Sequence, residues 1–274
     1  HKFGVDQRDA LLSKGHDPHL LAMSATPIPR SLAHAIFGDL ELAVLREKPP
    51  GREPVRTYLR PRSAREKVYA WLREQVTDRG HRAYVVFPLI ESNAPGRDHT
   101  SLIDGAEELA NGALRGARVG ILHGRMSPAD KLSIMKRFEA GAIDVLCSTT
   151  VIEVGVDVAE ATVMVVESPE AFGLSQLHQL RGRVGRGDET SRCILLHGDH
   201  LPPETLNRLT SFTTTSDGFE LAEIDLIMRG PGEFLGARQS GAAEFRFADI
   251  VRDREWLELA RADARRELFG DVVE

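Results

Sequence analysis

The sequence predicts an α/β protein with a parallel sheet that is covered by helices on both faces. Between about residues 54 and 200, short apolar segments alternate with amphipathic segments of helical length. The apolar segments, such as AYVVFPLI, are nearly continuous hydrophobic runs, which is typical of parallel strands buried on both faces. In such sheets, ligands are expected at the loops that follow the carboxyl ends of the strands.

The elements of this region follow one another in regular order. Strands are expected at 55–59, 83–90, 118–123, 143–149, 162–168 and 191–198. Helices are expected at 63–80, 105–116, 127–141 and 175–182. The alternation itself requires crossover connections, and hence a parallel sheet.

Capping residues mark the ends of two of these helices. Ser63 and Glu66 have the spacing of a capping box at the start of the first helix. Ser127 is expected to cap the third helix, with Pro128 in its first position and Gly141 at its end. These residues predict where each helix begins or ends.

The segments on either side of the alternating region differ from it, so three parts are expected: 1–48, 49–200 and 201–274. The first part holds one apolar run, HLLAMSATPIPR, and one helical stretch, too little to form a core alone. The third part is expected to hold two short helices joined near Asp217, a Gly-rich stretch at 229–241, and a charged helix at 255–269.

Composition excludes several classes of protein. The net charge of the 274 residues is -6, so any contact with nucleic acid has to come from local clusters of basic residues. No apolar run approaches the roughly 20 residues of a membrane helix, so no membrane partner is expected. Cys147 and Cys193 lie in apolar runs, which indicates reduced core residues and a cytoplasmic protein.

The segment QLRGRVGRG at 179–187 carries the strongest functional signal. Arginines at 181, 183 and 186 are interspersed with glycines at the start of a polar loop. Small residues allow guanidinium groups to approach an anion closely. Because phosphoryl transfer spreads negative charge over the transferred group, an arginine placed against that group stabilises the charge directly.

The spacing Q-x-x-G-R-x-G-R resembles the sixth motif of superfamily 2 helicases. Other segments resemble further motifs of that superfamily in the same order: SAT (24–26) motif III, HGRM (123–126) the motif IV region, and TTVIEVGVDV (149–158) motif V. The series SATPIPRSLA, PPGREPV, HGRMSPADK, FGLSQLHQLRGRVGRG and SDGFELAEIDLIMRGPGEFLGARQSG resembles the RecG family of bacterial ATP-dependent DNA helicases in particular.

This resemblance implies a RecA-like second motor lobe in 49–200, a remnant of the first lobe in 1–48, and a helical translocation module in 201–274. It implies hydrolysis of ATP with Mg²⁺ and remodelling of forked or branched DNA by a cytoplasmic monomer. The first motor lobe and an N-terminal wedge domain would complete the same parent chain.

The resemblance also assigns roles to residues. Gln179, Arg183 and Arg186 are implied as catalytic, with Arg186 as the arginine finger, and Gly155 and Asp157 are implied near the nucleotide.

A second set is implied in DNA contact or in coupling. Ser24, Thr26 and Thr150 would contact the DNA backbone or relay its occupancy. His123 would contact nucleotide or backbone, although a structural role is equally open. The residues implied in coupling hydrolysis to translocation are Arg208, Arg229 and Gln239.

Two sequence patterns of a complete ATP site are absent. The chain has no G-x-x-x-x-G-K-[ST] segment, and no Asp-Glu pair at a strand end that could hold Mg²⁺. The histidines show no metal-ligand spacing, so no metal site within the chain is expected. His1 resembles the last residue of the Asp-Glu-x-His box of the RecG family, and the following KFGV resembles the x-F-G-V that comes after that box. We therefore expect a fragment that does not hydrolyse ATP alone.

Two other functions remain open from the sequence. One is a transcription-repair coupling translocase, whose family shares the C-terminal element. The other is a motor-like lobe that only binds DNA or protein, against which the intact arginine motif argues.

Overall fold

The computed structural model describes residues 53–88, 97–149, 158–187, 189–229 and 253–270, and isolated residues at 13–15, 19, 21, 23 and 43–45. The chain divides into two compact units, one formed by 47–216 and the other by 1–46 together with 217–274. Each unit is described separately below.

The unit at 47–216 is built on a six-stranded sheet in the order β1-β6-β5-β2-β4-β3, and every strand pair is parallel. Its strands are β1 (Arg56–Pro61), β2 (Arg82–Val86), β3 (Val119–Leu122), β4 (Val145–Ser148), β5 (Ala161–Glu167) and β6 (Arg192–His197). The predicted parallel sheet is therefore confirmed. β2, β4 and β5 are almost entirely buried, as their continuous apolar sequences require.

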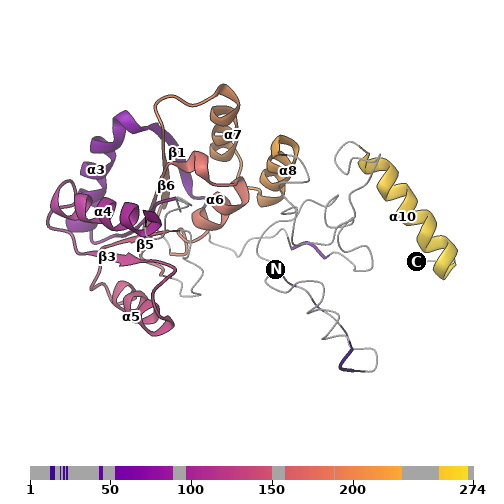
Figure 1. The fold of residues 1–274 in the computed structure, drawn as a ribbon, viewed down its shortest axis with the longest axis horizontal. Helices are drawn as coiled ribbons and strands as arrows, with labels where there is room; N and C mark the ends of the chain where they lie inside the picture. Colours follow the sequence, from indigo (N-terminus) through magenta and orange to yellow (C-terminus); the bar gives the residue numbers. More distant parts are fainter. Residues whose placement is uncertain are drawn as a thin grey trace. The chain divides into compact units, whose positions relative to one another are not determined.

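Helices cover both faces of this sheet (Figure 1). They are α3 (Arg65–Thr77), α4 (Arg97–Asn111), α5 (Pro128–Glu139), α6 (Leu174–Arg181) and α7 (Pro203–Thr214). α3 and α4 lie on one side of the sheet, and α6 and α7 lie on the other. Two 3-10 turns, η1 (Arg62–Ala64) and η2 (Pro169–Ala171), precede α3 and α6.

Alternation along the strands assigns the core residues to the two faces. Ala83 and Val85 of β2 pack with α3 and α4, in one buried cluster that includes Leu72 and Leu109. Tyr84 points to the opposite face, where its ring centroid lies 4.9 Å from that of Phe138 on α5. The sheet thus separates two hydrophobic layers.

One of the two predicted caps is confirmed. The Ser127 hydroxyl accepts the backbone N–H of Asp130 at 3.1 Å, Pro128 starts α5, and Gly141 follows α5 with φ of 72°. The start of α4 at Arg97 lies eight residues before the predicted position.

The predicted capping box at Ser63 is wrong. Ser63 lies inside η1, and α3 begins at Arg65 without a side-chain cap. The backbone N–H of Ser63 donates instead to Asp199 Oδ1 at 3.0 Å, from the loop after β6. A long-range hydrogen bond has replaced the local one that the spacing predicts.

The other unit contains α8 (Gly218–Arg229) and α10 (Arg254–Phe269). α7 ends at Thr214 and α8 starts at Gly218, so the predicted pair of short helices joined near Asp217 is confirmed, as is the charged C-terminal helix. The strand and helix expected within 1–48 and the Gly-rich stretch lie outside the described residues. Among the described helices, none has the length and apolarity to cross a bilayer.

Candidate functional site

The arginine motif forms the end of α6 and the loop that leads to β6; residues 182–190 are called the arginine loop. This loop lies at the amino ends of the strands, because α6 runs back across the sheet between two parallel strands. Gly185 lies against Val55, just before β1, and Gly187 lies against Ala159, just before β5. The loop is thus at the edge opposite to the carboxyl ends, where the general rule for such sheets places ligands.

Two glycines allow the arginine loop to lie directly on the strand ends. Gly185 has φ of 77°, and a Cβ there would lie 2.8 Å from Val55 Cγ2. A Cβ on Gly187 would lie 2.9 Å from the carbonyl oxygen of Ala159. Any larger residue would push the loop away from the sheet. A further contact at 3.3 Å joins Glu189 of the loop to His81 before β2.

Two of the predicted catalytic arginines are accessible. Arg183 is half-buried, and among the described residues no hydrogen bond or ion pair holds its guanidinium. Arg186 is exposed, and its Nε donates to the carbonyl oxygen of Gly182 at 3.3 Å. Gln179 is half-buried in the last turn of α6 and precedes the two arginines in the same short segment of the sequence.

The charges of these arginines reach the buried face of the sheet. Burial raises the pKa of Tyr84 on β2 to about 12, while the positive charges of Arg183 and Arg186 oppose that rise. An electrostatic effect of this kind requires proximity in a medium of low dielectric constant. Arg183 and Arg186 are therefore close enough to Tyr84 for their charges to act on its hydroxyl.

Arg181, the first arginine of the motif, has a different environment. It is 6% exposed, and its Nη1 donates to the carbonyl oxygens of Phe212 at 3.0 Å and Thr215 at 3.1 Å. Its guanidinium also lies 4.2 Å from the ring centroid of Phe212, and burial lowers its pKa. Arg181 thus binds the carbonyl groups that α7 leaves unpaired at its C-terminus. It fastens α6 to α7.

Arg208, which the resemblance assigned to the translocation module, makes the reciprocal contact. This α7 residue is 7% exposed, and its guanidinium donates to the carbonyl oxygens of Phe172 at 2.7 Å and Glu170 at 3.0 Å. Those carbonyl groups belong to the segment between β5 and α6. Arg181 and Arg208 together join α6 and α7 through buried hydrogen bonds at both ends.

The remaining predicted residues belong to other elements or lie outside the described part of the chain. His123 follows β3 at the carboxyl edge, where it is half-buried and its carbonyl oxygen accepts the N–H of Met126 at 3.3 Å. Arg229 ends α8 in the other unit, and its side chain is not among those described. The residues that lie outside the described part are Ser24, Thr26, Thr150, Gly155, Asp157 and Gln239.

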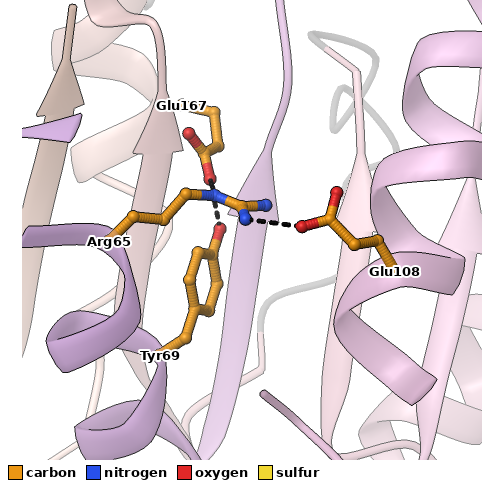
Figure 2. A network of polar contacts seen from close by, with 4 residues as sticks. All are labelled: Arg65, Tyr69, Glu108 and Glu167. Atoms are coloured by element: carbon orange, nitrogen blue, oxygen red, sulfur yellow. Dashed lines mark hydrogen bonds and ion pairs between the residues drawn. The ribbon is translucent and has the colours of Figure 1, made fainter. Parts of the chain in front are cut away.

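The structure also contains a polar network that the sequence analysis missed (Figure 2). It joins Arg65 and Tyr69 of α3, Glu108 of α4 and Glu167 at the end of β5, and we call it the Glu167 network. The sequence did contain a signal for this network, because Glu167 ends the otherwise apolar strand TVMVVE. A buried carboxylate requires partners, and so predicts a polar contact.

The described residues fit a phosphate better than a metal ion. Guanidinium groups without carboxylate partners bind phosphate oxygens through charge-assisted hydrogen bonds, and Arg183 is such a group. Within the described part of the chain, no three His, Cys, Asp or Glu side chains are grouped as metal ligands. The amino edge can therefore hold the phosphates of a nucleotide that binds there.

Two family models match the chain. The helicase conserved C-terminal domain matches residues 66–188, which include strands β2 to β5 and most of the arginine loop. The model described as ATP-dependent DNA helicase RecG, domain 3, C-terminal, matches residues 215–272.

Individual proteins extend this similarity to nearly the whole chain. The ATP-dependent DNA helicase RecG of Thermotoga maritima is 48% identical over 97% of this chain and 34% of its own length. That of Acidithiobacillus ferridurans is 46% identical over 99% of this chain and 39% of its own. A solved structure of RecG bound to a three-way DNA junction matches 89% of this chain and 32% of that one, with a TM-score of 0.68 and 44% identity. The chain thus spans about a third of the length of the curated relatives it matches.

Proposed function

We propose that this chain, which belongs to the RecG helicases as their C-terminal part, supplies the second motor lobe and coupling module of an ATP-dependent DNA helicase. The substrate would be branched DNA, such as a stalled replication fork or a Holliday junction. The accessible guanidinium groups of Arg183 and Arg186 on one edge of a RecA-like sheet are the observation that carries this proposal.

The arginine loop would face the nucleotide across the interface with the first motor lobe. Arg183 and Arg186 would bind the γ-phosphate, with Arg186 as the finger, and Gln179 would order the same site. Gly155 and Asp157 would lie near the nucleotide. When bound, ATP with Mg²⁺ supplies the phosphoryl group whose developing negative charge these arginines stabilise.

The contacts between α6 and α7 provide a physical link from the arginine loop to the first helix of the translocation module. Because Arg181 and Arg208 join the two helices through buried hydrogen bonds, a displacement of the loop would carry α7 with it. Arg208, Arg229 and Gln239 would then couple hydrolysis to translocation on duplex DNA.

Contacts with the DNA itself would be independent of base sequence. Ser24, Thr26 and Thr150 would contact phosphates or relay their occupancy, and His123 at the carboxyl edge would add a further contact. Phosphate contacts position a protein without reading sequence. Because the net charge of the chain is -6, such local contacts have to supply the attraction.

The proposed arrangement has three parts: 1–48 from the first motor lobe, 49–200 as the second lobe, and 201–274 as the translocation module. The full-length protein would also contain the rest of the first lobe and a wedge domain, and would act as a monomer in the cytoplasm.

Substitution of Arg186 tests the proposal. In the full-length protein, Arg186→Ala should lower the kcat of DNA-stimulated ATP hydrolysis by about 10³-fold, as for other arginine fingers, while ATP affinity changes little. Arg137→Ala, on the exposed part of α5, is the matched loss of one arginine and should leave kcat unchanged. An unchanged kcat in Arg186→Ala would remove Arg186 from the site.

The DNA specificity of the full-length protein separates the proposal from its alternative. Stronger stimulation of ATP hydrolysis by forked DNA than by linear duplex supports a helicase of branched DNA. Displacement of a stalled RNA polymerase without that preference would favour the transcription-repair coupling translocase. Absence of any ATP hydrolysis would leave a non-catalytic binding module.

A further inference from the structure

The Glu167 network (Figure 2) lies at the carboxyl end of β5. The arginine loop lies at the opposite, amino edge of the same sheet. Glu167 Oε1 accepts hydrogen bonds from Arg65 Nε at 2.9 Å and from the Tyr69 hydroxyl at 2.8 Å. The same Arg65 reaches Glu108 on α4, where its Nη1 donates to Oε1 at 2.8 Å. The buried carboxylate of Glu167 thus connects β5 to α3, and Arg65 extends the network to α4.

An apolar residue would satisfy the packing at this position more simply. Glu167 is 8% exposed, and the other six residues of β5 are buried, with mainly apolar side chains. Burial of a carboxylate is unfavourable unless hydrogen bonds and an opposite charge compensate for it. Burial and the neighbouring Glu167 charge together raise the pKa of Tyr69, so its hydroxyl stays protonated and remains a donor. The carboxylate therefore does more than fill space.

The chain changes direction immediately after Glu167. Ser168 has φ of 48° and ψ of 57°. Among the described residues, it is the only one other than glycine that has a positive φ. Its N–H donates to the carbonyl oxygen of Leu196 at 2.9 Å. Residues other than glycine rarely adopt this left-handed backbone conformation unless the surrounding structure imposes it. Here the chain leaves the sheet and passes through η2 into α6.

The exit from β5 is held on two sides. Glu167 ties its beginning to α3, and Arg208 ties the carbonyl oxygens of Glu170 and Phe172 to α7. α6 starts two residues later at Leu174 and has only eight residues, so it behaves as a short rigid rod. A shift at its start is therefore passed to its other end, which carries the arginine loop.

We propose that Glu167 is a positioning residue for the arginine loop, and that it acts by fixing the exit of β5 with Arg65 and Tyr69 as its donors. The proposal rests on the function proposed above for Arg183 and Arg186. It extends that site to the opposite edge of the sheet, and to a helix, α3, that does not contain any of the helicase motifs.

Substitution of Glu167 should lower kcat and leave the binding of ATP largely unchanged. A misplacement of about 1 Å in a catalytic group costs up to ~10²-fold in rate. Glu167→Ala should therefore lower the kcat of the full-length protein by about 10- to 100-fold, with KM for ATP within about threefold, because the arginines act on transition-state charge. Glu167→Gln still accepts both hydrogen bonds and should retain more activity than Glu167→Ala.

Hydrogen exchange in the 274-residue chain provides a readout that does not depend on activity. Glu167→Ala should speed exchange of the amides in 168–187, and leave α5 and β3 unchanged. Tyr69→Phe removes only one hydroxyl and should produce a smaller change in the same segment. It replaces Glu167→Ala as the test if that variant does not fold. Glu108→Ala removes the exposed acceptor of Arg65 Nη1 and is the control that should change neither exchange nor kcat.

The outcomes separate this proposal from the proposed function. Faster exchange in 168–187 together with lower kcat supports positioning. Unchanged exchange in that segment in both Glu167→Ala and Tyr69→Phe overturns it, as does altered exchange with unchanged kcat. If the unsubstituted full-length protein shows no DNA-stimulated ATP hydrolysis, the proposed function fails instead, and with it the positioning of a catalytic loop.

Discussion

Replacement of Arg181 by methionine should destabilise the chain although Arg181 belongs to the arginine motif. Methionine keeps the apolar stem but leaves the carbonyl oxygens of Phe212 and Thr215 without their donor. Each hydrogen bond from a charged donor contributes about 1.5–3 kcal/mol. Removal of a buried cation offsets part of this loss. We therefore expect the free energy of unfolding to fall by about 3 kcal/mol.

The loss is large enough to measure by thermal or urea unfolding. For a protein of this size, about 3 kcal/mol corresponds to a decrease in Tm of about 6–12 °C. Arg183→Met is the matched control, because it removes an arginine two residues away whose guanidinium has no partner among the described residues. Equal Tm values for the two variants, or a loss below about 1 kcal/mol in Arg181→Met, would refute the structural role of Arg181.

Three further results are expected. Gly185→Ala should lower the free energy of unfolding by about 1–3 kcal/mol, because it combines positive φ with a contact of 2.8 Å, as thermal unfolding would measure. Burial alone would raise the pKa of Asp144, but hydrogen bonds from Arg118 lower it below its ordinary value. Its contribution to stability is therefore present above about pH 4 and lost at more acidic pH, a loss that Asp144→Asn should abolish in unfolding measured against pH. Arg229→Ala or Gln239→Ala in the full-length protein should abolish fork unwinding but leave DNA-stimulated ATP hydrolysis largely intact, which parallel assays would measure.

Each of these has a control or a contrary outcome. Gly80 also has a positive φ, of 72°, but no atom lies within 4 Å of an added Cβ there. Gly80→Ala should therefore lower the free energy of unfolding less than Gly185→Ala does. An acid unfolding midpoint that is the same with and without Asp144 would contradict the ion-pair argument. Equal loss of unwinding and hydrolysis in the two coupling variants would indicate that those residues are only structural.

The sequence predicts the sheet and most elements because their signals are local. Apolar runs and residues such as Ser127, Pro128 and Gly141 define α5 within a few positions, and the structure confirms them. The start of α3 could not be predicted in this way, because the N–H of Ser63 is bound by Asp199, which lies 136 residues further along the chain. The order of the strands in the sheet could not be predicted either, because it depends on pairing between distant segments.

The arginine motif shows the same division within the candidate site. Its spacing predicts a phosphate-binding segment, but Arg181 and Arg183 cannot be told apart by spacing alone. Their environments differ because Arg181 binds carbonyl groups of α7, more than 30 residues away, whereas no described carbonyl group binds Arg183. The position of the loop at the amino edge follows from the return path of α6, which again is a property of the fold.

The bonds around α6 limit how the arginine loop can move. Arg181 holds the end of α6 to α7, Arg208 holds the segment before α6 to the same helix, and Glu167 holds the exit of β5 to α3. Movement of α6 without α7 would break the charged hydrogen bonds of Arg181 and Arg208, at a cost of about 1.5–3 kcal/mol for each. A hinge within α6 is therefore unfavourable compared with a rigid displacement of α6 and α7 together. For a lobe that responds to a nucleotide at one edge, this arrangement favours movement of the whole layer over local rearrangement of the loop.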